Sequence, residues 1–468
     1  MQIYSKSSDF IWNYSGLFFK MAGQLLLLPM VLSMLQDDLV GLWYVFLAVN
    51  SFVTTFQAGF GPTFGRNVAF CWSGSTAFLV EGAPKVDGGE VNFPVLRALI
   101  GSCKRIYRMI AFAVLIGAAS LGSLYVVSVS EGLTPAQYTA AWVVFCIGVF
   151  VNVLYTYWDS FLRGIGDFAG VNKAIIVSSL TQIAVIAVML LLDLGLLSCA
   201  VGFLVQGLVF RFMCKLFFFR AEGMREGLGG APTPTRSEVC EIGRALSVNA
   251  FKDTAVSLAN YAVTTSNTLL CAAFIGLSES SVFSVTLQVL NACVNLSTVA
   301  LTTYSPSMQS AYVNGNKELG RKLAGKCLVS FYALYSVGFT LVLFVCMPVL
   351  GLFKPGIDSM PLLTISLGLY LLLWRHHSLC ATLISNTNHV PYATSFVFSA
   401  VLGVALSVVF LILSGGSVLG LVAGQAIAQL VYNNWKWPHE AGRLYDTTYP
   451  CLLRAGVKAF TARFKRSR

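Results

Sequence analysis

Long apolar stretches recur along the whole chain and are separated by shorter polar connections. A helix needs about 20 apolar residues to cross the hydrocarbon core of a bilayer. Windows of that length predict twelve spans, over residues 10–35, 39–60, 107–130, 139–160, 174–196, 198–219, 250–275, 281–304, 326–352, 360–384, 392–414 and 418–436. The runs are continuous and lack the apolar–polar alternation of a transmembrane β-barrel. The pattern therefore predicts an all-α integral membrane protein with about twelve transmembrane helices.

Composition agrees with that class and excludes others. Hydrophobic residues make up 56% of the 468 residues and charged residues only 11%, whereas a soluble domain carries about 25% charged residues. The 12 cysteines are scattered singly, without a CxxC pair, so the sequence indicates neither a metal site nor a disulfide framework. No nucleotide-binding glycine loop or catalytic constellation is evident. We expect no cofactor, no metal, no catalytic residue and no nucleic-acid partner, and hence a protein that is not an enzyme.

Basic residues divide the connections into two sets. One set contains most of the lysines and arginines, among them Lys104, Arg105 and Lys317. The other set is short, nearly free of cations, and carries acids such as Asp37 and Glu131. Because loops rich in lysine and arginine stay in the cytoplasm, both termini and all the long loops are predicted to be cytoplasmic.

The midpoint of the chain has the composition of a linker, rich in Gly, Pro and Thr ("RAEGMREGLGGAPTPTRSEVCEIGR"). It predicts an N-terminal six-helix lobe (1–219), a cytoplasmic linker (220–249), a C-terminal six-helix lobe (250–436) and a basic cytoplasmic tail (437–468). A faint repeat places "NYSGLFFK" opposite "NYAVTTSN", each in the first span of its half. The two stretches have the same orientation, and substrate sites tend to lie where such halves meet.

Polar residues at helical spacing form stripes in the first two spans of each half. If the four stripes face one another, they enclose a central polar cavity. The residues expected to line it are Asn13, Lys20, Gln24, Asn50, Gln57, Asn260, Asn267, Asn291 and Asn295. The alternative is that these amides only join neighbouring helices by hydrogen bonds.

Charged residues within the spans indicate whether this cavity prefers anionic or cationic ligands. A lysine at mid-bilayer, such as Lys20, costs about 2.5–3.5 kcal/mol, and Arg375 lies about fifteen residues into its span. A cation-lined cavity with apolar walls selects anions, because low dielectric strengthens the attraction. Asp159, Asp253 and His376 are candidates for ion or proton coupling, since titratable groups in membranes often relay protons.

Residues 41–74, "GLWYVFLAVNSFVTTFQAGFGPTFGRNVAFCWSG", resemble the second span and following cytoplasmic segment of Wzx-type O-antigen flippases. These polysaccharide flippases belong to the MOP superfamily, which also contains the MATE drug exporters. The segment "SMQSAYVNGNKELGRKLAGK" and the layout of two six-helix halves extend the resemblance over the chain.

The resemblance implies a V-shaped alternating-access transporter in the bacterial inner membrane. Its substrate would be an undecaprenyl-pyrophosphate-linked O-antigen or related oligosaccharide, flipped from the cytoplasmic to the periplasmic leaflet through a cationic cavity. Arg66 corresponds to the family's arginine after the "GFGPT" turn, at the cytoplasmic mouth. Membrane lipids and other polysaccharide-assembly membrane proteins are the further partners that it implies.

Two other classes stay open. A MATE-like cation-coupled small-molecule exporter would be expected to hold a carboxylate deep in the cavity, where this sequence has a lysine. A membrane glycosyltransferase, an O-antigen polymerase or ligase, usually presents a large periplasmic loop, whereas every connection on that side is short here.

The flippase hypothesis predicts the behaviour of Lys20 variants. Lys20→Ala is expected to impair export of the lipid-linked glycan without preventing membrane insertion, and Lys20→Arg to preserve part of it, because the guanidinium keeps the charge. Surface glycan in a strain that lacks its own flippase measures both variants. Full export by Lys20→Ala would contradict a contact between Lys20 and the substrate.

Overall fold

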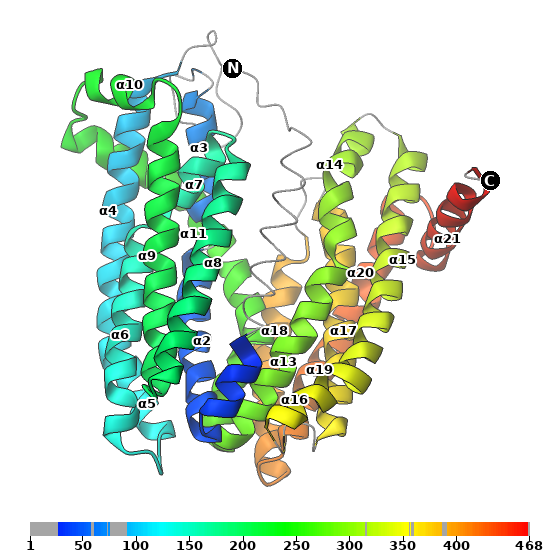
Figure 1. Ribbon diagram of the computed structural model, residues 1–468. Helices are drawn as coiled ribbons and strands as arrows, with labels where there is room; N and C mark the ends of the chain where they lie inside the picture. The colour runs from blue at the N-terminus through cyan, green and yellow to red at the C-terminus, as the bar shows by residue number, and fades with distance from the viewer. Residues whose placement is uncertain are drawn as a thin grey trace. The chain divides into compact units, whose positions relative to one another are not determined.

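The computed structural model describes residues 27–57, 60–72, 74, 91–313, 316–354, 356, 360–385 and 391–466. All regular elements in these residues are helices (Figure 1), which confirms the predicted all-α class. The chain forms two compact units, one that ends at Tyr261 and one that begins at Ala262.

The first unit is a bundle of long helices with shorter helices at its ends. Its elements are α2 (Asp37–Gln57), α3 (Phe60–Trp72), α4 (Phe93–Gly117), η1 (Ala118–Gly122), α5 (Ser123–Val129), α6 (Pro135–Leu154), α7 (Tyr157–Gly164), α8 (Phe168–Leu191), α9 (Leu196–Arg220), α10 (Met224–Gly230) and α11 (Arg236–Thr264). The helix α9 packs against α6 and α8, and α3 packs against α7.

The second unit repeats this construction and adds a helix at the C-terminus. Its elements are α12 (Ser266–Phe274), α13 (Leu277–Ser297), α14 (Val299–Val313), α15 (Lys317–Leu341), η2 (Val342–Cys346), α16 (Met347–Phe353), α17 (Pro361–Ser385), α18 (Ala393–Leu413), α19 (Val418–Val431), α20 (Asn433–Leu444) and α21 (Tyr449–Arg466). The helix α18 packs on α19, α17 on α20, and α15 on α21.

The longest continuous helical stretch of each unit has the same internal design. Each runs for 37 residues, over Phe93–Val129 and Lys317–Phe353. An asparagine precedes each helix and accepts a hydrogen bond from the backbone three residues later, which caps the helix start. A five-residue π-helical segment then begins at Ala118 and at Val342, each 25 residues after the first residue of its helix. The two halves therefore share an irregular feature that the faint sequence repeat does not reveal.

Eight helical stretches in the described residues are long and apolar enough to cross a membrane. They coincide with eight of the predicted windows, five in the first unit and three in the second. Window 10–35 lies mostly outside the described residues. Windows 250–275 and 418–436 are helical but are interrupted at Thr265 and at Tyr432, respectively. Window 360–384 is helical, but Arg375 and its histidine neighbours make it more polar. The count of twelve spans stays a prediction.

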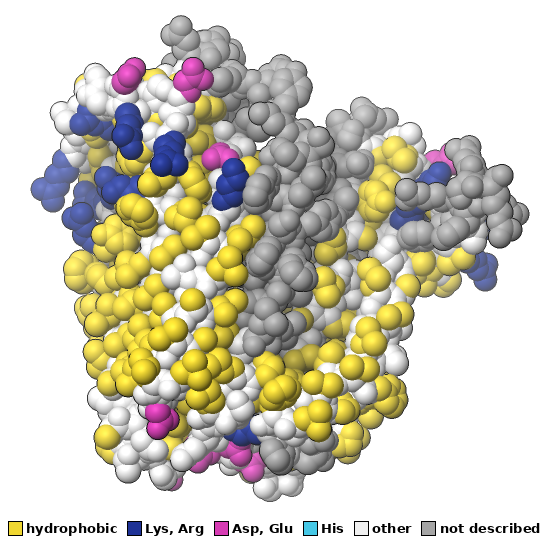
Figure 2. All heavy atoms as spheres, in the orientation of Figure 1, with side chains coloured by type: hydrophobic (Ala, Val, Ile, Leu, Met, Phe, Trp, Pro, Cys, Tyr) yellow, Lys and Arg dark blue, Asp and Glu magenta, His cyan; other side chains and the backbone are white. Residues whose placement is uncertain are grey.

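Charge is distributed unevenly over the outer surface of the first unit. Apolar side chains cover its middle, and lysine and arginine gather at the end that holds α10 (Figure 2). Phe112 and Leu180 are among the exposed apolar side chains of its long helices. At the opposite end the exposed charges include Glu131 and Asp193. This arrangement is typical of a multi-pass membrane protein with a basic and an acidic end. We call the end that holds α10 the cationic end.

Residues 220–249 are largely helical. They contain α10 and the first half of α11, and both helices pack on α4. A capping box starts α11, because Thr235 N donates to the Glu238 carboxylate and Glu238 N donates to Thr235 Oγ1. The predicted boundaries at residues 219, 250 and 436 stay predictions.

The helix α21 lies against the start of α15. Gly325 and Gly456 face each other, and a Cβ on Gly325 would lie 2.6 Å from Gly456 N. Leu452 of α21 is completely buried. Small residues at this contact let the two backbones approach closely, so the basic C-terminal segment is an integral part of the second unit.

Candidate functional site

The residues predicted to line a cavity are only partly described. Asn13, Lys20 and Gln24 lie outside the described residues. For Arg66 in α3, and for Asp253 and Asn260 in α11, the helix is described but the side chain is not. The predicted roles of these six residues stay predictions.

In the first unit, α2 carries Asn50 and Gln57. Trp43 and Phe46 fix α2 to α6, with ring centroids 6.0 and 5.1 Å from that of Phe145. Asn50 follows one turn later, and Gln57 is 6% exposed with its Nε2 bonded to no described residue. An unsatisfied buried amide costs free energy unless water or a ligand meets it.

The end of α11 in the first unit lies beside α2. Tyr261 Oη donates to the Ala48 carbonyl at 3.1 Å, and the Tyr261 ring contacts Phe52 at 5.5 Å. Asn260 therefore sits on a helix next to the one that carries Asn50. The two helices that carry these predicted stripes are therefore neighbours, and the meeting of their polar faces stays a prediction.

In the second unit, the polar stripe of α13 lies on a different face of the helix from the residues that pack against neighbouring helices. Leu290, Cys293 and Val294 are buried against neighbouring helices. Asn291 is half-buried and Asn295 is exposed, and neither amide has a hydrogen bond to a described side chain in the second unit. The exposed Asn295 amide is thus available to solvent or to a ligand.

Asn267 instead belongs to a buried ladder of amides, formed by Gln425, Gln429 and Asn433 at four-residue spacing in α19 and α20. Gln425 Nε2 donates to Asn267 Oδ1 at 3.2 Å. Asn433 Nδ2 donates to Gln429 Oε1 and to Ser399 Oγ, both at 2.9 Å, and Asn433 Oδ1 accepts from Trp437 Nε1 at 3.0 Å. For Asn267 the structure therefore favours the alternative of amides that join helices. The i, i+4 spacing signalled this ladder, but sequence reasoning did not select it.

His376 of α17 meets two tyrosines from helices distant in sequence. Tyr332 Oη lies 2.5 Å from His376 Nδ1 and 2.6 Å from Tyr449 Oη, and Tyr449 Oη lies 3.4 Å from the same imidazole nitrogen. Burial raises the pKa of the Tyr449 phenol well above its usual value, so this hydroxyl is neutral. The three groups form a hydrogen-bonded relay that joins α15, α17 and α21, and we call it the His376 relay.

Arg375 precedes this histidine and has no carboxylate partner among the described residues. Its guanidinium carbon lies 4.2 Å from the centroid of the Trp374 ring, and its Nε has no hydrogen-bond partner. A partly buried guanidinium without a counter-ion attracts anions strongly, because the surrounding dielectric is low.

Asp159, the other described candidate for coupling, lies in α7 near the cationic end. It accepts a hydrogen bond from Arg163 Nε at 2.9 Å. Arg211 of α9 is also within its electrostatic reach, and Arg211 Nε is buried without a hydrogen bond. Asp159 is therefore compensated by two cations. In the described part of the chain, no cluster of three or more His, Cys, Asp or Glu side chains has metal-binding geometry.

No protein-family model matches the sequence, and no curated protein matches it significantly. Solved structures do match in fold over almost the whole chain. An inward-facing MATE family multidrug resistance transporter of the MOP superfamily is 14% identical, with a TM-score of 0.68 over 95% of this chain and 97% of that chain. An outward-facing transporter of the same description is also 14% identical, with a TM-score of 0.56 over 96% and 94%.

A MOP superfamily transporter from Pyrococcus furiosus is 13% identical, with a TM-score of 0.55 over 96% of this chain and 94% of that chain. The reversed polarity of its binding pocket suggests a different function for that protein. Identities this low show a common fold alone. This chain accordingly has the fold of the MATE-type MOP transporters and is a multi-pass membrane protein.

The amide ladder predicts the stability of the second unit. Asn433→Ala leaves Trp437 Nε1, Ser399 Oγ and Gln429 Oε1 without their shared partner, and each buried polar group without a partner costs about 1–3 kcal/mol. We expect a clearly lower midpoint of thermal unfolding in detergent. Asn295→Ala, which removes an exposed amide, is the matched control and should leave the midpoint within the experimental error. Equal midpoints for the two variants would show that the ladder does not stabilise the fold.

Proposed function

We propose that this protein is a secondary transporter that moves its substrate across the membrane by alternating access. The observation that carries this proposal is the match in fold, over nearly the full length, to MATE family transporters in inward-facing and outward-facing conformations. A MATE-like small-molecule exporter is the first candidate that follows from this similarity.

A second candidate is the flipping of an undecaprenyl-pyrophosphate-linked O-antigen or related oligosaccharide. The specific observation that favours it is the sign of the charges. Arg375 lies inside α17 with no carboxylate partner among the described residues, whereas Asp159 lies near the cationic end and is balanced by Arg163 and Arg211. Such a distribution favours an anionic substrate over a cationic one. Lys20 at mid-span, and Arg66, would extend this preference.

We place the cationic end of the first unit in the cytoplasm, in keeping with the positive-inside rule. The chain then lies in a bacterial inner membrane with both termini cytoplasmic. Export would proceed from the cationic end to the end that holds Glu131. Other polysaccharide-assembly membrane proteins are partners only if the second candidate holds.

Arg375 provides the test of substrate class. Purified protein in proteoliposomes is offered an anionic and a cationic fluorescent substrate in parallel. We expect Arg375→Ala to reduce transport of the anionic substrate about tenfold, as for the loss of a hydrogen bond to a charged group, and Arg375→Lys to retain most of it. Transport of the cationic substrate should change little.

Arg321→Ala, which removes an exposed cation from α15 of the same unit, is the control and should transport both substrates normally. Restored surface polysaccharide in a flippase-null strain would support the second candidate, and a failure there together with dye export would support the first. Transport of neither substrate class would overturn the proposal of a transporter.

The His376 relay is the coupling group that we favour, because histidine is the side chain whose ordinary pKa lies near neutral pH. We expect His376→Gln to transport its substrate without a response to an imposed proton gradient. His439→Gln, at an exposed histidine of α20, should respond like the unmodified protein. If transport by the unmodified protein persists unchanged when a protonophore collapses the gradient, proton coupling is wrong, and Asp159 and Asp253 lose that role as well.

A further inference from the structure

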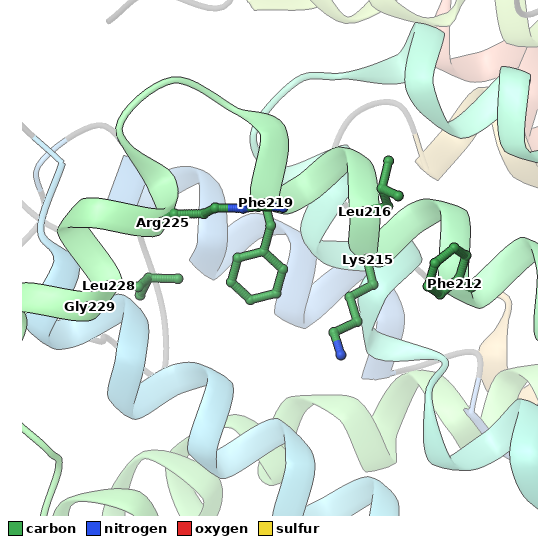
Figure 3. Close-up of a pocket in the computed structure, with 7 residues that line it drawn as sticks. All are labelled: Phe212, Lys215, Leu216, Phe219, Arg225, Leu228 and Gly229. Carbon is green, nitrogen blue, oxygen red and sulfur yellow. The ribbon is translucent and has the colours of Figure 1, made fainter.

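A groove of about 580 Å³ lies between α9 and α10 at the cationic end of the first unit (Figure 3). Its walls are mostly apolar, and two cations project from them. Lys215 comes from α9, and Arg225 extends from α10 toward α9 (Figure 3). The apolar walls are formed by Phe212, Leu216, Phe219 and Leu228.

The wall that α10 contributes is held by α4. Arg97 Nη1 donates to the carbonyl of Leu228 at 3.3 Å and also to that of Ala231. Gly227 lies so close to the Phe93 ring that a Cβ would overlap it, and Met224 is completely buried. A segment with the composition of a linker is thereby fixed as one side of a preformed groove.

The opposite wall is supported by aromatic packing. The Phe219 ring lies 5.5 Å from that of Trp158 in α7. Lys215 Nζ lies 5.8 Å from the centroid of the same Trp158 ring. Both the apolar wall and the position of the ammonium group are therefore defined by one buried tryptophan.

Positive charge accumulates beside this groove without compensation. Lys104 of α4 is close enough to Lys215 and to Arg108 for mutual repulsion. None of these three cations has an ion pair within the described part of the chain. Glu222 and Glu226, next to Arg225, are exposed and do not line the groove. Like charges held together in this way attract an anion.

The groove continues into the apolar surface of the bundle. Leu208 and Phe212 are 45% and 65% exposed, and with Leu216 and Phe219 they form a stripe along α9 at spacings of four, four and three. A ligand bound here would thus meet cations at one end and a hydrocarbon-compatible surface at the other. Free phosphate would use only the first of these.

We propose that this groove is a binding site for an anionic phospholipid. The phosphate of its headgroup contacts Lys215 and Arg225, with Lys104 and Arg108 adding long-range attraction, and one acyl chain lies along Leu208 and Phe212. Basic pockets at the membrane surface bind acidic headgroups in this way. The site lies within the first unit and is independent of which substrate the protein transports.

Lipid retention by the full-length protein tests this site. The protein is purified from mixed phosphatidylglycerol and phosphatidylcholine micelles, and the retained lipid is counted by native mass spectrometry. Lys215→Ala with Arg225→Ala is expected to lower retained phosphatidylglycerol about tenfold, given the contribution of each cation at a membrane surface. Leu228→Trp, which fills the groove without altering charge, should do the same.

The matched control is Arg321→Ala with Lys322→Ala, which removes two exposed cations from α15 and should retain the lipid like the unmodified protein. Unfolding midpoints in phosphatidylcholine alone establish that all variants are folded. Equal retention by all variants would overturn the proposal. Displacement of the retained lipid by millimolar inorganic phosphate would also overturn it, because the site would then recognise phosphate without the acyl chain.

Discussion

Every polar group held at membrane depth must find its partner inside the protein, and this constraint organises both units. The backbone meets it by forming helices throughout the described residues. Side chains meet it through specific pairs, of which Asn433 is the clearest case. Its amide nitrogen donates hydrogen bonds to Ser399 of α18 and Gln429 of α19, and its amide oxygen accepts one from Trp437 of α20. The break between α19 and α20 at Tyr432 is placed directly beside this junction.

Some buried polar groups do not meet this constraint, and these groups are candidates for binding water or a ligand. Arg375 Nε, Gln57 Nε2 and Gln425 Oε1 are buried without a hydrogen bond to a described residue. Such groups need water or a ligand to offset their desolvation. Arg375 adjoins His376 in α17, and Gln425 belongs to the amide ladder in α19. The second unit therefore combines a rigid amide ladder with a nearby set of incompletely satisfied groups.

A fold can persist at 14% identity because a membrane bundle makes few demands on particular residues. Each span needs an apolar surface of sufficient length, and each close contact needs a small residue, as Gly325 and Gly456 provide for α15 and α21. Neither demand involves the substrate. The similarity in fold to MATE transporters is consequently strong evidence for architecture, and the fold does not specify charged side chains such as Arg375.

The sequence alone determined the all-α membrane class, eight of the spans, and the concentration of basic residues at one end of the first unit, because hydropathy and helical periodicity are local properties. It also pointed to Arg375 and His376, since a charge or imidazole inside an apolar window is visible without any partner. Only the tertiary structure decided what those side chains meet. Tyr449 reaches His376 across 73 residues of sequence, and Arg97 fixes Leu228 across 131. Such pairs depend on which helices pack together, and periodicity within one helix carries no information about its neighbour.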